Sequence, residues 1–305
     1  MSIEFGKVVP WRPRPVSPTG GRVQSNSGDA ISALEIILLA LLGVVVGTYG
    51  TIVGVGGGFL VVPLLLIIYK LPPAAAAATS LVVVLLNSAS GSVTYIRRGR
   101  VDIRTGLLLA AATVPGAYFI GPELAERIPE RAFKIGFGVF LMVMATLLFF
   151  RPERQARASG APPRKGLWRV RRTFRDGSGA TVDYEFDVVL AVVLSFVVGI
   201  LSSMLGIGGG IVHVPALIHL MGFPVHVATA TSQFVLAFTA AAGVAKYTSG
   251  GHVVWPLAAG IGAGVILGAQ IGARVSHRMK GAKIIRLLVL AIVVLAARLI
   301  WSAIR

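Results

Sequence analysis

The sequence predicts an all-α membrane protein with two homologous four-helix repeats, about eight transmembrane helices in total, and three observations support this. Of its 305 residues, 55% are hydrophobic and only 13% are charged, about half the charged fraction of a soluble domain. Eight apolar stretches have the length needed to cross a hydrocarbon core of about 30 Å. The two halves also share their glycine and proline positions. Together these observations exclude a single water-soluble globule.

The chain divides into four parts. Residues 1–30 combine proline, glycine and serine with basic residues, so they have too little apolar surface to fold and are expected to form a disordered arm. Repeat 1 is expected at 31–150, a connector at 151–187 and repeat 2 at 188–305. The expected spans are 31–53, 74–95, 105–121, 132–150, 188–205, 225–247, 253–273 and 282–304.

The connector is basic, with nine Lys or Arg, and we expect it on the cytoplasmic side. Apolar residues recur at two-residue spacing around Asp176-Gly-Ser-Gly: Trp168, Val170 and Phe174 precede it, and Val182, Tyr184 and Phe186 follow it. Alternation around a turn signal indicates a small β-hairpin.

An internal repeat links the two halves. Residues 47–121 align with 199–273 without a gap at a constant separation of 152 residues, which superimposes Gly54 on Gly206 and Pro63 on Pro215. Shared apolar composition alone would not align glycines and prolines. Duplicated membrane halves are typical of transporters, whose substrate site lies between the repeats. Whether the repeats are parallel or inverted stays open.

The positive-inside rule favours four spans in each half with both termini cytoplasmic, because most of the 29 Lys and Arg then lie inside. In this topology the short stretches 59–69 and 211–221 re-enter from one side, and Arg274 to Arg286 fall outside. Five spans per half with an external N-terminus obey the rule nearly as well.

A glycine cluster follows the first span of each half. Consecutive glycines cost a helix about 1 kcal/mol each relative to alanine, so we expect the helix to break there. A break inside a bilayer is tolerated where it is buried or lines a cavity, and the half-helix that follows directs unpaired N–H groups at that space, which suits an anion. The candidate binding residues are Gly56, Gly57, Gly58, Gly208, Gly209 and Gly210.

Close helix packing is the alternative explanation for these glycines. The packing pattern itself, one glycine every fourth residue, occurs at Gly260, Gly264, Gly268 and Gly272, and we assign that face to helix contact. No Lys-Ser/Thr follows either cluster, so a phosphate-binding loop is not expected.

Polar residues within the spans complete the candidate site. None of the twelve acids lies in the middle of a span, which favours an anionic over a cationic substrate. His213 follows the second cluster and is expected to contact a substrate or proton, or to pack as a core histidine. The other candidates, each of which could instead bond its own helix, are Thr79, Ser80, Asn87, Thr231, Ser232 and Gln233.

No cofactor or metal site is expected, because there is no cysteine and no carboxylate has metal-ligand spacing to the histidines. The net charge of +17 is assigned to anchoring on anionic lipid rather than to nucleic acid. The expected partners are the lipid bilayer and a small anion, with a homo-oligomer left open.

With its doubled Gly-x-Gly-Gly-Gly, a proline five residues later and the Ala-x-Ala-Thr-Ser stretches ending at Ser80 and Ser232, the chain resembles the TauE/SafE family of sulfite exporters from about Leu34 to Trp301. The resemblance implies a transporter in the cell membrane, the inner membrane if bacterial. It implies export of sulfite, organosulfonates or related anions. A passive anion channel, a carrier of another oxoanion or carboxylate, and an intramembrane enzyme are the alternatives; the enzyme lacks a convincing nucleophile and base.

Overall fold

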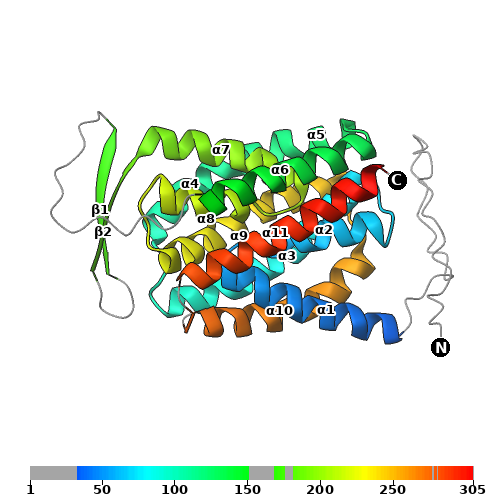
Figure 1. The fold of residues 1–305 in the computed structure, drawn as a ribbon, viewed down its shortest axis with the longest axis horizontal. Helices are drawn as coiled ribbons and strands as arrows, with labels where there is room; N and C mark the ends of the chain where they lie inside the picture. Colours follow the sequence, from blue (N-terminus) through cyan, green and yellow to red (C-terminus); the bar gives the residue numbers. More distant parts are fainter. Residues whose placement is uncertain (1–32, 151–167, 176–180, 277, 280, 305) are drawn as a thin grey trace.

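A computed structural model describes residues 33–150, 168–175, 181–276, 278–279 and 281–304, and these are largely helical (Figure 1). The expected arm at 1–30 lies outside the described residues. The elements are α1 (Ala33–Val53), α2 (Gly58–Ile67), α3 (Pro73–Arg97), α4 (Ile103–Pro115), the π-helical η1 (Gly116–Ile120), α5 (Gly121–Arg127), α6 (Glu130–Phe150), β1 (Arg169–Arg175), β2 (Thr181–Asp187), α7 (Val188–Leu205), α8 (Gly210–His219), α9 (Val225–Ser249), α10 (Trp255–Ser276) and α11 (Gly281–Ile304).

The all-α membrane class is confirmed, whereas the count of eight spanning helices is not. In the described part of the chain, seven helical segments are long and apolar enough to cross a membrane. The helix α6 is not among them, and its first five residues include Glu130, Arg131 and Lys134. The segment Ile103–Arg127 joins α4, η1 and α5 into one continuous rod. The π-helical turn in it lies between Pro115 and Pro122, each of which removes a backbone donor.

Elements separated by 152 residues have matching bounds. Both α3 and α9 have 25 residues, both α2 and α8 have 10, and each of these short helices starts at the last glycine of its cluster. The two long helices run antiparallel, because α3 begins beside the segment after α9 and α9 begins beside the segment after α3. The Val254 amide accordingly donates to Thr79 Oγ1 at 3.0 Å, and the Asp102 amide donates to Thr231 Oγ1 at 3.2 Å.

Each short helix returns the chain toward the end from which it came. The Tyr69 hydroxyl, just after α2, donates to Glu35 Oε1 at the start of α1. In the second half, the ring of Phe223 after α8 packs against that of Tyr184, in the strand that leads into α7. The pairs α1–α2 and α7–α8 are therefore re-entrant, entering from opposite ends of the molecule.

The topology with both termini on the connector side is wrong. The start of α1 and the end of α11 lie at one end of the helices, and the hairpin lies at the other (Figure 1). The guanidinium of Arg98 donates to the Ala273 carbonyl at 3.4 Å, which places the end of α10 beside the end of α3. The described basic residues between Arg274 and Arg286, which that topology placed outside, thus share the hairpin end with the arginines that follow α3. The physical reason is that each re-entrant pair makes no net crossing.

The glycine face at Gly260 to Gly272 packs as predicted. A Cβ on Gly264 would lie 1.8 Å from the Ala40 carbonyl oxygen, and one on Gly268 would lie 2.3 Å from that of Val44. Small residues thus let α10 lie with its backbone against α1. The corresponding contact in the other half joins α7 to α4 and η1, where a Cβ on Gly199 would meet the Thr113 carbonyl at 2.1 Å.

The two strands of the predicted hairpin are confirmed, while the expected turn at 176–179 lies outside the described residues. Strands β1 and β2 pair antiparallel with Arg172 opposite Tyr184, and they lie across the helix ends (Figure 1). Asp187 ends β2 and caps α7, since its carboxylate accepts the Leu190 amide at 3.1 Å.

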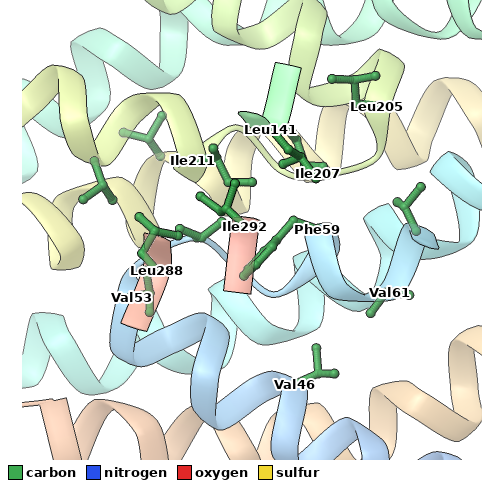
Figure 2. Packing of buried hydrophobic residues seen from close by; sticks show 14 of the residues in the cluster. Val46, Val53, Phe59, Val61, Leu141, Leu205, Ile207, Ile211, Leu288 and Ile292 are labelled. Atoms are coloured by element: carbon green, nitrogen blue, oxygen red, sulfur yellow. The ribbon is translucent and has the colours of Figure 1, made fainter. Parts of the chain in front are cut away.

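The apolar core lies where the two short helices meet. Three side chains are fully buried here: Phe59 of α2, Ile207 just before α8 and Ile211 of α8. Figure 2 shows them converging with Ile292 of α11. The re-entrant pairs are therefore held at the centre of the helices by packing from both halves.

Candidate functional site

The glycine clusters break the helices as predicted. Gly54, Gly56 and Gly57 have φ near +80°, and their counterparts Gly206, Gly208 and Gly209 have φ between +71° and +88°. This left-handed conformation is one that side chains other than glycine rarely adopt. The sequence Gly-x-Gly-Gly-Gly therefore turns the backbone sharply and starts a new half-helix.

The two glycine loops, residues 54–58 and 206–210, lie directly against each other. A Cβ on Gly58 would be 2.5 Å from the Gly206 carbonyl oxygen, and one on Gly210 would be 2.6 Å from that of Gly54. Close packing, the alternative explanation for the glycines, is thus correct alongside the helix break. Both properties are required where two loops cross at the centre of a protein.

Apolar side chains seal this crossing. The space that a Cβ would occupy on Gly56 and on Gly208 is filled by methyl groups of Val84 and Leu236. These two residues are themselves 152 positions apart, one on α3 and one on α9. Side chains from both halves therefore fill the space beside the loops where a cavity was expected, and we call this packed arrangement the closed state.

The first two backbone amides of each half-helix are unpaired where the glycine loops cross. As the first residues of a helix, Gly58 and Phe59 have amides that α2 itself cannot satisfy, and the same holds for Gly210 and Ile211 in α8. Within the described residues these four amides have no hydrogen-bond acceptor. Buried amides without acceptors are rare, so the two half-helices carry donors available to an anion.

The Thr-Ser pairs join the two halves. The hydroxyl of Ser80 donates to the Gly206 carbonyl at 2.8 Å, and that of Ser232 donates to the Gly54 carbonyl at 3.0 Å. Each serine thus holds the glycine loop of the other half. Thr79 and Thr231 accept the amides that precede α10 and α4, as described above. In the closed state these four side chains contact backbone, so a substrate contact remains a prediction.

In each half, one tyrosine holds the end of the helix that precedes the glycine loop. Tyr95 donates to the Thr51 carbonyl at 2.9 Å, and Tyr247 donates to the Ser203 carbonyl at 3.1 Å. Both tyrosines are fully buried at the ends of α3 and α9. Their equivalence across the repeat was visible in the sequence, but their role as donors to the end of the preceding re-entrant helix was not.

Asn87 and Gln233 lie together on one side of the crossing. Thr51 Oγ1 donates to Asn87 Oδ1 at 3.0 Å and accepts from Gln233 Nε2 at 3.3 Å. All three side chains are fully buried, yet Asn87 Nδ2 and Gln233 Oε1 have no partner within the described residues. Repeat symmetry does not extend to this cluster, because Thr239 and Leu81 occupy the equivalent positions. Thr51 was not predicted, since a lone threonine in an apolar span carries no sequence signal.

His213 lies away from this cluster, on α8. Its Nε2 is 3.3 Å from Ser195 Oγ of α7, and its side chain is 1% exposed. Nδ1 has no partner in the described part of the chain. The position is Val61 in the first half. Its prediction as a substrate or proton contact therefore stays open, with Ser195 as the neighbour that sequence reasoning missed.

A pocket opens at the end of the helices opposite the hairpin. Its volume is about 610 Å³. It lies between the start of α3, the end of α5 and the segment before α10, with His252 Nε2 3.6 Å from Glu126 Oε1 on its wall. Sequence reasoning did not find this pocket, because its walls are brought together only by the antiparallel arrangement of α3 and α9. In the residues that the structure describes, no three His, Asp or Glu side chains are grouped to hold a metal ion.

These features define a polytopic helical membrane protein whose two halves enclose paired helix breaks. A family model described as "Sulfite exporter TauE/SafE" matches residues 39–299. The chain belongs to this family.

Relatives support the same class. The chain is 29% identical over 278 residues to the probable membrane transporter protein YunE of Bacillus subtilis, covering 89% of this chain and 99% of the relative. It is 30% identical over 214 residues to the probable membrane transporter protein ORF9 of a Sinorhizobium species, covering 70% and 73%. A probable membrane transporter protein of Methanocaldococcus jannaschii is 26% identical over 260 residues, covering 81% and 88%. No solved structure matches this chain significantly. Family and relatives together make it a multi-pass membrane transporter.

Proposed function

We propose that this protein is a secondary carrier that exports a small sulfur-containing anion, such as sulfite or an organosulfonate. The observation that carries the proposal is the meeting of two half-helix starts, each with two unpaired amide donors, at the crossing of the two halves. Donors of this kind favour negative charge, because they add to the positive end of the helix dipole. The family description supplies the sulfur oxoanion as the substrate class.

Alternating access of two inverted four-helix repeats is the proposed mechanism. The re-entrant pairs enter from opposite ends, and the antiparallel α3 and α9 place equivalent contacts on opposite faces, as expected for inverted repeats with a site between them. In the closed state Val84 and Leu236 cover the glycine loops. Relative rocking of the halves would withdraw these two side chains and expose the amides first to one face and then to the other.

The substrate would be held by neutral groups. Thr51, Asn87 and Gln233 lie beside the crossing, and the unpartnered Asn87 Nδ2 adds a donor. An oxoanion suits such a set, since it accepts several hydrogen bonds at once, and the described spans carry no acidic side chain at this depth to repel it. In this proposal, the predicted residues of the glycine loops and the Thr-Ser pairs belong to the part of the protein that moves apart to admit the substrate.

Charge distribution supports a cytoplasmic location for the hairpin end. The arginines after α3, those of β1 and the basic residues around the start of α11 gather there and outnumber its acids Asp102, Asp183, Glu185 and Asp187. The described part of the opposite end has fewer bases beside Glu35, Glu123, Glu126 and Glu130. By the positive-inside rule this orientation places the connector inside and Ala33 outside, in the cell membrane.

Counterflow in proteoliposomes tests the proposal. Vesicles containing the purified protein are loaded with unlabelled sulfite, thiosulfate, sulfoacetate, sulfate or acetate, and uptake of the labelled anion is measured. A carrier gives faster uptake when the same anion is present on the trans side, and we expect this for sulfite or sulfoacetate. Uptake without trans acceleration, accompanied by a large conductance, would favour a passive channel. Acceleration by acetate alone would make the substrate a carboxylate instead.

A further inference from the structure

We propose that the connector hairpin is a plug that closes the inner mouth of the transport path, opposite the open outer pocket. The inference rests on the proposed transport function and adds a device that regulates access. Its starting point is a comparison of the two ends of the molecule, which repeat symmetry makes equivalent.

Each position that lines the outer pocket has an equivalent position in the other half of the sequence. Its lining includes Pro72, Ala75 and Val254. Residues 152 positions away from these are Pro224, Val227 and Asp102, which belong to the start of α9 and the segment before α4. The inverted arrangement places this second set at the hairpin end.

The hairpin contacts this second set at Asp102 and at the residue before Pro224. The Tyr184 hydroxyl donates to Asp102 Oδ2 and lies 3.0 Å from Thr105 Oγ1. Its ring centroid lies 4.0 Å from that of Phe223, the residue before Pro224. Tyr184 is 4% exposed although it lies in a two-stranded element at the end of the molecule.

Exposure differs between the two ends in the segments that precede α10 and α4, whereas Ala75 (4% exposed) and Val227 (2% exposed) are both buried. Val254 is partly exposed in the wall of the outer pocket, whereas its counterpart Asp102 is 7% exposed. The contact also reaches the centre, because Asp102 caps α4 with its side chain and donates its amide to Thr231 of the Thr-Ser pair. If α4 moves relative to α9, the contact between Tyr184 and Asp102 must therefore break, or the hairpin must move together with α4.

Cysteine accessibility tests the plug without knowledge of the substrate. The chain has no cysteine, so a single Val227→Cys reports the inner mouth and a single Val254→Cys, at a partly exposed position of the pocket wall, reports the outer pocket. A membrane-impermeant maleimide is added to vesicles of each orientation. We expect Val254→Cys to react from the outer face and Val227→Cys to be protected from the hairpin face.

Cutting the hairpin contact should expose the inner mouth. With Tyr184→Ala, labelling of Val227→Cys should rise about tenfold, the change expected when a hydrogen bond is lost from one side of a two-state equilibrium. Arg171→Ala, which removes only the exposed hairpin ion pair with Asp183, is the matched control and should leave the protection unchanged. Continued reaction of Val254→Cys shows that the variants are folded.

Two results would overturn the plug. One is equal labelling of Val227→Cys in the parent and in Tyr184→Ala; the other is greater labelling in Arg171→Ala than in Tyr184→Ala. If Tyr184→Ala fails to fold, Tyr184→Phe decides, because it keeps the ring and removes only the hydroxyl contacts. Unchanged protection in that variant would also reject the plug. Because labelling measures access alone, a failure here is distinct from failure of the substrate proposal.

Discussion

The serines that join the two glycine loops offer the sharpest test of how the halves are held together. Ser80→Ala combined with Ser232→Ala removes the hydrogen bonds to the Gly206 and Gly54 carbonyls. Hydrogen bonds between membrane helices contribute about 0.6 kcal/mol on average and up to about 1.7 kcal/mol. The pair should therefore lower the free energy of unfolding by about 1 to 3 kcal/mol.

The assay is SDS-induced unfolding of the purified protein in mixed micelles, followed by the helical circular dichroism signal. Ser88→Ala is the matched control, since Ser88 lies on the same helix but donates only to its own turn, to the Val84 carbonyl at 2.7 Å and more weakly to that of Leu85. Its effect should stay within about 0.5 kcal/mol.

The alternative interpretation makes these serines substrate ligands and nothing more. In that case the double variant would be as stable as Ser88→Ala and would lose substrate affinity alone. That pair of results would refute the reasoning that the hydroxyls join the loops.

Two further predictions concern the glycines. Gly57→Val and, separately, Gly209→Val should abolish transport while the protein still inserts, because each residue has positive φ and a Cβ would lie within 3 Å of Val46 Cγ1 or Val198 Cγ1; normal counterflow by both would exclude a role for the breaks. Gly264→Ala should destabilise the protein by about 1 to 3 kcal/mol through overpacking, whereas Gly136→Ala, with open space around its Cβ, should be neutral or stabilising by up to about 1 kcal/mol; equal unfolding midpoints for the two would contradict the close contact of α1 and α10.

The repeat and its breaks could be predicted because their causes are local. Glycine at Gly54 to Gly58 permits positive φ whatever surrounds it, and the 17 to 23 apolar residues of each predicted span suffice for a membrane helix. The hairpin followed from alternation around a turn. Loop composition alone was misleading for topology, because the α1–α2 and α7–α8 pairs look like a span plus a short stretch but return to the side from which they start.

Sequence by itself therefore determined the class of protein, the helix breaks and the equivalence of positions 152 residues apart. Only the tertiary structure decided which half each polar group serves. Ser80 contacts the Gly206 carbonyl of the other half, Thr79 accepts the Val254 amide from the segment after α9, and Tyr184 contacts Asp102. The physical reason is that these partners are distant in sequence and become neighbours only when two antiparallel halves interlock, an arrangement that no local pattern encodes.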